Sequence, residues 1–360
     1  MYLLAIDWFF IIEKLVLIAL IITLSMVVAM YATYGERKVA AFIQDRIGPN
    51  RAGPFGLLQP LADGGKLFFK EEIIPLASSR FLFILGPMLA MITALLTSAV
   101  IPWGTAVKIG ERMVPLQVAD VNIGILYVFG VVSLGVYGIM LGGWASNNKF
   151  SLLAAIRGAS QMVSYELAMG MSLIAILMLT GSLQMSAIVD AQRGGALGDL
   201  ASWNIFGGGW QILGFLIFFI CALAECNRTP FDLAEAENEL NFGYHQEYSS
   251  MKLGFYLFAE YINMFISGVI MSTLYFGGYD IPFVNEAKLA MQIGGNWVAV
   301  LTFLCLFLKA LIFVFVFMWI RWTIPRFRFD QLMHLGWKRL IPLALLNMII
   351  TALVVLWLKK

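Results

Sequence analysis

Charged residues are scarce in this 360-residue chain, at 13% of the sequence, whereas hydrophobic residues make up 61%. Soluble domains contain about 25% charged residues. The composition therefore excludes an ordinary soluble protein and predicts an all-α polytopic membrane protein. The net charge of +2 is too small to indicate a nucleic-acid partner.

Cysteine and histidine are also rare, which limits the cofactors that the chain could bind by itself. The three cysteines, Cys221, Cys226 and Cys305, form no CxxC pair, so metal or iron–sulfur ligation is not expected. His245 and His334 fall outside the expected membrane spans, which excludes a bis-histidine haem within the bilayer. The sequence has no Walker A motif and no GxGxxG after a strand, so nothing in it supports nucleotide binding.

Long apolar runs are what the sequence does contain. Windows of about 20 apolar residues predict eight transmembrane helices in one membrane domain that covers residues 1–360. We expect them near 9–33, 81–102, 119–143, 162–181, 210–226, 254–277, 298–320 and 341–358. The first run is long enough to span and no basic segment precedes it, so it is not a cleavable signal.

The distribution of lysine and arginine predicts the orientation of these spans. Sixteen lie in the four segments 34–80, 144–161, 227–253 and 321–340, and six lie on the opposite side with both termini. The positive-inside rule makes the side with sixteen cytoplasmic. Both termini are therefore expected on the extracytoplasmic side.

The first cytoplasmic loop has the pattern of an amphipathic helix. An apolar stripe of Leu57, Leu61 and Phe68 lies opposite a polar stripe of Gln59, Asp63, Lys66 and Lys70 at helical spacing. Two interpretations remain open. The helix turns Asp63 and Lys66 toward a polar cavity, or it only anchors the loop at the membrane surface.

The most unusual segment is a group of carboxylates between two expected spans. It comprises Glu225, Asp232, Glu235, Glu237 and Glu239, with Arg228 among them. Carboxylates so close together cannot all ionise at low cost, so some should have raised pKa values, as a proton relay requires. Arg228, with Asp232 four residues on, supplies a local counter-charge. A solvated acidic loop is the alternative interpretation.

Three more charged residues interrupt apolar stretches, where a charge costs about 2.5–3.5 kcal/mol on insertion scales. Glu166 is expected at the start of the fourth span and Glu260 inside the sixth. Each is either part of a proton relay or a neutral carboxyl that serves as a structural hydrogen-bond partner. Lys309 lies near the middle of the seventh span and is expected to face a carboxylate or an aqueous cavity.

Charged residues also cluster at the cytoplasmic ends of two other spans. Glu36, Arg37 and Arg46 follow the first span, and Arg321 and Arg326 follow the seventh. Opposite charges placed side by side suit a narrow polar constriction. They equally suit contact with lipid head groups.

Several long strings resemble the family of the H subunit (mitochondrial subunit 1) of respiratory complex I, the NADH:quinone oxidoreductase. The first runs from Gly35-Glu36-Arg37-Lys38 through Gly48-Pro49-Asn50 to Leu58-Gln59-Pro60, and the second from Ala224-Glu225-Cys226-Asn227-Arg228 to Glu239-Leu240. Gly142-Gly143-Trp144-Ala145-Ser146-Asn147 and Pro325-Arg326-Phe327-Arg328-Phe329-Asp330 also match. The resemblance extends from about residue 8 to residue 358.

The resemblance implies a non-redox-active membrane subunit of a proton-pumping translocase, located in a bacterial inner membrane. FMN and iron–sulfur clusters would lie in partner subunits, and the substrate would be ubiquinone or menaquinone. The residues implied at the quinone chamber are Glu36, Arg37, Arg46, Asp63, Arg228, Asp232, Arg321 and Arg326. Those implied in the proton path are Glu166, Glu225, Glu235, Glu237, Glu239 and Glu260. Lipids and other complex I subunits would be its partners.

Two alternatives differ in the function of the charged loops. The anchor subunit of a membrane-bound hydrogenase-type complex has a similar glutamate loop but needs no quinone chamber. A stand-alone ion-coupled transporter is disfavoured because the sequence has no convincing inverted repeat.

The third expected span lacks an obvious residue for a proton relay, because it has no acid beyond Asp120 at its edge. A relay there needs Tyr127, Tyr137 or water, or must pass elsewhere.

Overall fold

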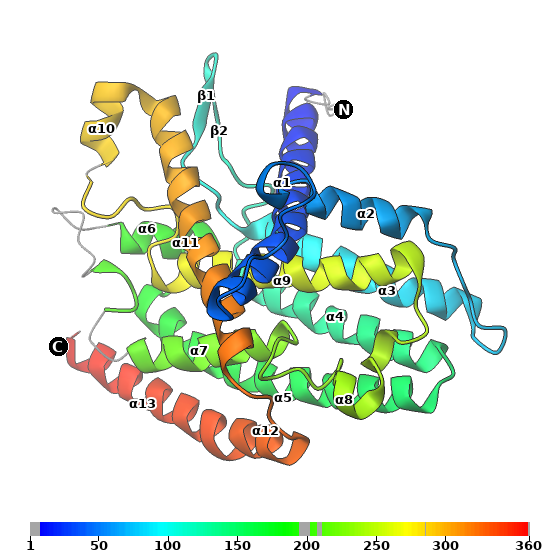
Figure 1. The fold of residues 1–360 in the computed structure, drawn as a ribbon. Coiled ribbons are helices and arrows are strands. Elements are labelled where there is room, and N and C mark those ends of the chain that lie inside the picture. The colour runs from blue at the N-terminus through cyan, green and yellow to red at the C-terminus, as the bar shows by residue number, and fades with distance from the viewer. Residues whose placement is uncertain (1–7, 194–201, 207–210, 285, 359–360) are drawn as a thin grey trace, which may run out of the picture.

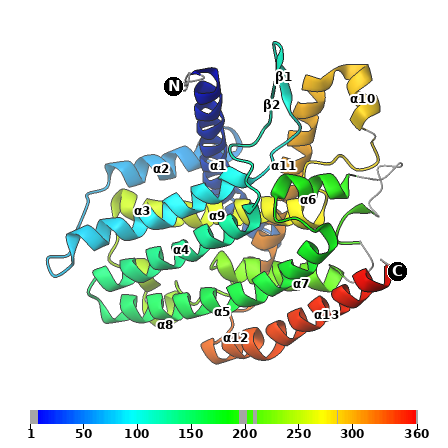
Figure 2. The same ribbon diagram turned by 180° about the vertical axis from the view of Figure 1, so that it is seen from behind.

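The computed structural model describes residues 8–193, 202–206, 211–284 and 286–358, and these residues are almost entirely helical (Figure 1, Figure 2). The long helices are α1 (Trp8–Ile43), α3 (Arg80–Leu96), α4 (Gly124–Ala145), α5 (Lys149–Thr180), α7 (Gln211–Glu225), α9 (Ser250–Tyr275), α11 (Gly295–Thr323) and α13 (Ile341–Leu358). Shorter helices are α2 (Gln59–Phe69), α6 (Met185–Gln192), α8 (Glu237–Leu240), α10 (Glu286–Ile293) and α12 (Phe329–Leu335).

Seven of the described helical segments are long and apolar enough to cross a membrane, which confirms the predicted all-α polytopic class. They are Trp8–Ile43, Arg80–Val100, Gly124–Ala145, Lys149–Thr180, Ser250–Tyr275, Gly295–Thr323 and Phe329–Trp357. The expected fifth span falls on α7, whose 15 residues are apolar but shorter. Helices suit this environment because they satisfy their own backbone hydrogen bonds without water.

The connecting segments gather at opposite ends of the helices. The loops 70–79 and 146–148 lie with α8 at the right of Figure 1, and α6, α10 and the end of α13 lie at the left. The N-terminal half of α1 is connected to α6 through the segment that precedes α4. Lys14 Nζ of α1 donates to the carbonyl oxygen of Gln117 at 3.0 Å. Three residues later in the same segment, Asp120 accepts a hydrogen bond from the hydroxyl of Ser186 of α6 at 3.0 Å.

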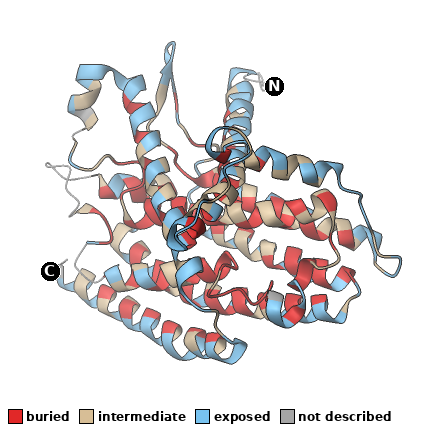
Figure 3. Ribbon diagram, viewed as in Figure 1, coloured by how far each residue is buried: buried red, intermediate tan, exposed pale blue. Residues whose placement is uncertain are grey.

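The core lies around α9, which carries Glu260. In the most apolar stretch of α9, 61% of the residues are buried, against 22% in the segment that contains α13 (Figure 3). Tyr256 of α9 reaches between α3 and α4, where its hydroxyl donates to the carbonyl oxygen of Gly138 at 3.0 Å. A Cβ atom on Gly142 would come within 1.9 Å of that hydroxyl, so glycine is needed there.

The helix bounds differ from the expected spans at two functional positions. Helix α1 continues to Ile43, so Glu36 and Arg37 lie on a helix rather than in a loop. Helix α5 begins at Lys149, which places Glu166 in its middle rather than at its start. Both extensions are amphipathic ends that hydropathy windows leave out because they contain charges. A short antiparallel hairpin, β1 (Val107–Ile109) and β2 (Arg112–Val114), joins α3 to α4 and was not expected.

Candidate functional site

The amphipathic helix predicted in the first loop is α2, and it forms one wall of a cavity of about 390 Å³. The other walls come from α1, α9 and the end of α11. The lining residues are Met30, Thr33, Glu36, Arg37, Pro60, Asp63, Gly64, Leu67, Leu257, Phe258, Tyr261 and Trp322. The cavity thus combines an apolar surface with a few charged groups, which is the usual character of a site for a small organic ligand.

Glu36 is the buried carboxylate of this cavity, and three helices or loops supply its partners. Tyr261 of α9 donates its hydroxyl to Oε2 at 2.8 Å. Arg321, at the end of α11, places Nη1 2.8 Å from Oε1. Arg228 approaches Oε2 from the other side at 3.7 Å. A carboxylate held by so many donors stays in one orientation, so Glu36 is a fixed element of the wall.

Arg37 and Asp63 form the second polar group of the cavity wall. Their side chains pair across α1 and α2, with Arg37 Nη1 2.7 Å from Asp63 Oδ2. Gln59 Nε2 donates to the other oxygen of Asp63 at 3.1 Å, one helical turn away on α2. Asp63 therefore faces the cavity, as the first of the two sequence interpretations predicted, whereas Lys66 is not among the lining residues.

Arg46 lies at a neighbouring, more open hollow of about 640 Å³ that also includes Arg37, Arg51 and Gln59. Its Nε donates to Oε1 of Gln44 at 2.7 Å. Arg37 is the residue common to both hollows. The structure thus brings Glu36, Arg37 and Asp63 together and leaves Arg46 beside them.

Arg228 is almost fully buried, with 4% of its surface exposed, and it joins the cavity to the protein interior. Its Nη1 lies 3.7 Å from Glu36, and its Nη2 lies 3.7 Å from Oε2 of Glu260. The guanidinium also lies over the ring of Tyr261, 4.1 Å from the centroid. One cation is therefore shared between a carboxylate on the cavity and a carboxylate beyond it.

The partner of Asp232 is Arg326, not Arg228 as the local spacing suggested. Arg326 Nη2 donates to Oδ2 of Asp232 at 2.7 Å, which ties the loop after α7 to the segment after α11. Burial and the nearby Glu235 raise the pKa of Asp232 to about 8, although Arg326 and Arg228 act in the opposite direction. Asp232 is therefore a carboxyl that can change its protonation near neutral pH.

The loop that contains these groups is anchored by Gln161 of α5. Its Nε2 donates to the carbonyl oxygens of Ala224 at 2.8 Å and Phe231 at 2.7 Å. Burying a loop requires such partners for its backbone groups. Helix α8 begins only at Glu237, so Glu235 precedes it and does not share a helical face with Glu239.

Glu235 and Glu260 are close enough for their charges to interact. Both are buried, and they lie within hydrogen-bonding reach of each other. Tyr244 donates its hydroxyl to Oε1 of Glu260 at 3.2 Å. His245, next to Tyr244, is 2% exposed, and burial lowers its pKa against the opposing effect of Glu235. A neutral imidazole and a tyrosine thus accompany the carboxyl pair.

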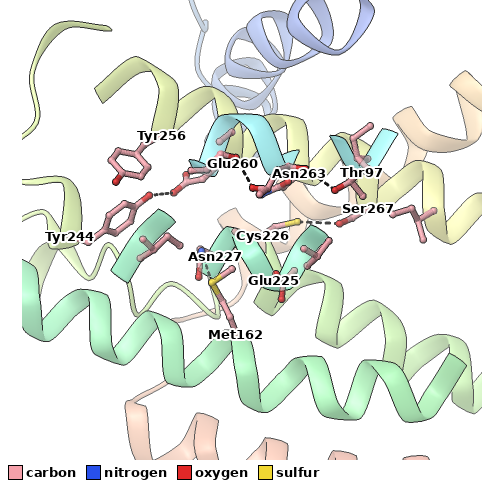
Figure 4. Close-up of a pocket in the computed structure, with 18 residues that line it drawn as sticks. Thr97, Met162, Glu225, Cys226, Asn227, Tyr244, Tyr256, Glu260, Asn263 and Ser267 are labelled. Carbon is pink, nitrogen blue, oxygen red and sulfur yellow. Dashed lines mark hydrogen bonds between the residues drawn. The ribbon is translucent and has the colours of Figure 1, made fainter. Parts of the chain in front are cut away.

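Glu260 also lines an enclosed cavity of about 50 Å³, and Glu225 at the end of α7 lines it from another side (Figure 4). Since one water needs about 10–15 Å³, there is room for about three waters. Oε2 of Glu225 is buried and has no hydrogen-bond partner among the described protein residues. Asn227, Asn263 and Ser267 add polar atoms to the lining. Two carboxyls therefore share one small polar cavity.

Glu166 of α5 lies close enough to Glu225 for its charge to act on that residue. Ser133 of α4 donates its hydroxyl to Oε1 of Glu166. The third expected span therefore contributes a serine at this point. Tyr127 donates instead to the carbonyl oxygen of Leu96, and Tyr137 is 57% exposed.

Glu239, the last glutamate of the group, is not part of this buried series. Glu239 turns to the surface, where its Oε2 lies 2.8 Å from Nη2 of Arg157. The side chain of Glu237 lies outside the described residues.

Lys309 was expected to face a carboxylate or an aqueous cavity; the carboxylates of Asp280 and Glu286 lie close enough for their charges to act on it, but they are not its direct hydrogen-bond partners. Its Nζ donates to the backbone carbonyls of Phe276, Gly278 and Asp280. The segment that follows α9 therefore supplies main-chain oxygens to the ammonium group.

Sequence reasoning missed several residues that complete the site, chiefly Ser133, Tyr244 and His245. No charge marks Ser133 among the apolar residues of its span. Tyr244 and His245 follow the glutamate loop, and Tyr244 reaches Glu260 only because the chain folds back from that loop toward α9. Tyr261 follows Glu260 directly in the sequence, but its hydroxyl reaches Glu36.

Comparisons with known proteins give consistent results. A family model described as NADH dehydrogenase matches residues 15–352. The NADH-quinone oxidoreductase H subunit 1 of Cytophaga hutchinsonii is 60% identical over 347 residues, which cover 96% of this chain and 98% of that protein. The H subunit of the Flavobacterium johnsoniae enzyme is 59% identical over 347 residues, covering 96% of each chain. Subunit 8 of the Rhodothermus marinus enzyme is 45% identical over 353 residues, again covering 96% of each.

Proposed function

Because the chain belongs to the H subunit family of NADH-quinone oxidoreductase, a membrane subunit of respiratory complex I, we propose that it holds the quinone and starts the proton path. The head group of the quinone would occupy the cavity between α1, α2, α9 and α11. The buried carboxyls beyond that cavity would couple quinone reduction to ion translocation.

The observation that carries this proposal is the position of Arg228. It is buried and lies 3.7 Å from a carboxylate on the cavity wall and 3.7 Å from a carboxylate in the interior. A change of charge on Glu36 therefore alters the environment of Glu260 through one shared cation.

The cavity fits a quinone in size and chemistry. Its volume of about 390 Å³ lies within the range of small-molecule sites, roughly 300–1,000 Å³. Met30, Phe258 and Trp322 offer apolar contact to a ring, and Arg37 offers N–H groups to a quinone oxygen. The fit supports the chamber role of Glu36, Arg37 and Asp63.

The chemistry of the substrate explains why carboxyls should follow the chamber. Reduction of a quinone to a quinol consumes two electrons and two protons. The electrons would come from FMN and iron–sulfur clusters in partner subunits, since this chain is proposed to have no redox centre. Each proton demand would be met through the buried carboxyls beyond the chamber, among them Glu260, Glu225 and Glu166, and Asp232 would respond near neutral pH.

We further propose that the end with the loop 70–79 and α8 is cytoplasmic, where it would meet the peripheral-arm subunits. Both termini would then be extracytoplasmic in a bacterial inner membrane, following the distribution of lysine and arginine. Exposed aromatic and aliphatic side chains on α1, α11 and α13 would contact lipids or neighbouring membrane subunits.

A matched pair of variants in the whole complex tests the proposal. Glu36→Gln removes the carboxylate from the chamber wall, whereas Glu239→Gln removes a half-exposed carboxylate paired with Arg157. We expect Glu36→Gln to abolish most NADH–quinone turnover and to leave NADH–ferricyanide activity, which needs only the peripheral arm. Glu239→Gln should retain turnover. Equal turnover in the two variants would reject the chamber assignment.

Purification tests the assignment to complex I itself. The native assembly should co-isolate with flavin and iron–sulfur subunits and should reduce a quinone with NADH. Isolation with a hydrogenase that lacks NADH–quinone activity would favour the related anchor-subunit function instead.

A further inference from the structure

Lys309 lies in the middle of α11, far from the chamber and from the buried carboxyls. Its ammonium group donates three hydrogen bonds to backbone carbonyls: to Phe276 at 2.7 Å, to Gly278 at 2.8 Å and to Asp280 at 2.8 Å. An ammonium has three N–H groups. All of them are therefore used, and all by main-chain oxygens of one short segment.

The segment is built to present these oxygens. Helix α9 ends at Tyr275, and the last carbonyls of a helix lack partners within it and carry its negative pole. The chain then turns tightly through Gly277 and Gly278, which have φ angles of +73° and +57°. A Cβ atom at Gly277 would come within 2.4 Å of Nε1 of Trp203, so the turn needs glycine there.

The surroundings suit a cation rather than an ion pair. The indole of Trp203 covers the ammonium, 4.4 Å from the ring, in the arrangement of a cation–π contact. Asp280 contributes its backbone oxygen, and its carboxylate accepts from Trp203 Nε1 at 3.2 Å. The nearby Glu286 is already paired with Arg193.

We propose that the carbonyls of Phe276, Gly278 and Asp280 form a binding site for one primary ammonium ion, which Lys309 fills to lock α9 against α11. The three carbonyls lie just beyond the C-terminal end of α9, so the yield and Tm of the complex test this site independently of the quinone chamber. The ligand that fits this site is a cation with three N–H donors in a pyramidal arrangement.

The hydrogen bonds of Lys309 lie near a point where α9 and α11 approach each other closely. A Cβ atom on Gly268 of α9 would lie 3.1 Å from the carbonyl oxygen of Ala310, the residue after Lys309. That close approach sets the separation of the helices, and the ammonium fixes how far one can slide along the other. Arg321 lies twelve residues after Lys309, about 18 Å along α11 at 1.5 Å per residue. Lys309 is therefore a positioning residue for the end of α11.

Chemical rescue in the whole complex tests the site. Lys309→Ala removes the ammonium and opens a path to the carbonyls, because Lys309 is only partly buried. We expect lower yield of the assembled complex, a lower Tm and loss of most NADH–quinone turnover. Ethylammonium, supplied during growth and in the assay, should restore part of all three. Tetramethylammonium should restore none, because it carries a charge but no N–H donor.

Two further variants serve as controls. Lys309→Met keeps the length of the side chain without the charge, so it should be impaired but should not respond to ethylammonium, since the thioether occupies the path. Lys14→Ala removes another lysine from a spanning helix, one that donates to a single carbonyl, that of Gln117. Ethylammonium should not change its behaviour.

The outcomes separate clearly. Rescue of Lys309→Ala by ethylammonium but not by tetramethylammonium supports the site. The same holds if the variant assembles only when ethylammonium is present. Absence of rescue, equal rescue by tetramethylammonium, or a Lys309→Met complex with wild-type Tm and turnover would each overturn it. Failure of the chamber assignment would leave the rescue of yield and Tm unaffected.

Discussion

Replacing Arg228 by methionine should have the largest effect of any single change at the site. The variant removes a cation that lies 3.7 Å from Glu36 and 3.7 Å from Glu260, and the side chain is almost fully buried. At an effective dielectric constant of about 20, each such pair is worth about 4 kcal/mol of Coulomb attraction. Desolvation offsets much of this in the intact protein.

The cost of the variant is larger than the net value of the ion pairs, because Glu260 and Glu36 both lose the shared cation, although Arg321 remains beside Glu36. Breaking a buried pair by removing one partner costs about 3–5 kcal/mol. At 1.4 kcal/mol for each factor of ten, that is roughly two to three and a half orders of magnitude. That factor applies to the stability of the assembled site, so we expect Arg228→Met to lower the yield and Tm of the complex and to lose most NADH–quinone turnover while NADH–ferricyanide activity persists.

A second change should repair part of this loss. Glu260→Gln in the same chain removes one of the two unbalanced carboxylates, so the double variant should assemble better, and have a higher Tm, than Arg228→Met alone. The assay is yield and Tm of the purified complex together with NADH–quinone turnover. Wild-type turnover in Arg228→Met, or a double variant less stable than the single one, would refute the role of Arg228 as a shared counter-charge.

Three other predictions concern the chamber, the loop and the interior. Asp63→Asn should raise KM for a short-chain quinone, because it weakens the hold on Arg37 at the cavity wall; an unchanged KM would remove Asp63 from the chamber. Since the pKa of Asp232 is about 8, its carboxyl loses its proton as the pH rises through that value. The pH profile of turnover should therefore have a limb near pH 8 that Asp232→Asn eliminates, and its persistence would exclude this residue as the source. Glu225→Gln should lower proton release per NADH in proteoliposomes while Glu239→Gln retains it, and equal pumping by both would exclude Glu225 from the path.

The sequence was sufficient for the class of protein and the family. Long apolar runs predict spanning helices with little ambiguity, because lipid leaves the backbone few alternatives. The amphipathic stripe of residues 57–70 predicted α2, including the side that Asp63 occupies. Helix ends were less accurate, because the charged ends of α1 and α5 continue as helix beyond the apolar windows.

Pairing within the site was harder to predict, because it depends on contacts between distant segments. Local spacing assigned Asp232 to Arg228, whereas the loop brings Arg326, 94 residues away, to Asp232. Arg228 is thereby left to Glu36 and Glu260. The two-residue spacing of Glu235, Glu237 and Glu239 suggested one group, yet Glu235 turns inward and Glu239 outward.

Lys309 illustrates a limit of reasoning by charge alone. A lysine within the bilayer suggests a carboxylate or water, since these are its commonest partners. The structure supplies three carbonyls of a tight turn instead. Main-chain acceptors are invisible in a sequence, although the paired glycines Gly277 and Gly278 after an apolar run do indicate such a turn.

The central claim is that reduction of the quinone changes the protonation of buried carboxyls in this chain. Infrared difference spectra of the whole complex, recorded as the bound quinone is reduced, measure this directly through the carboxyl C=O bands. We predict bands that are lost in Glu260→Gln and Glu225→Gln and retained in Glu239→Gln. Identical spectra in the wild type and in all three variants would contradict the claim.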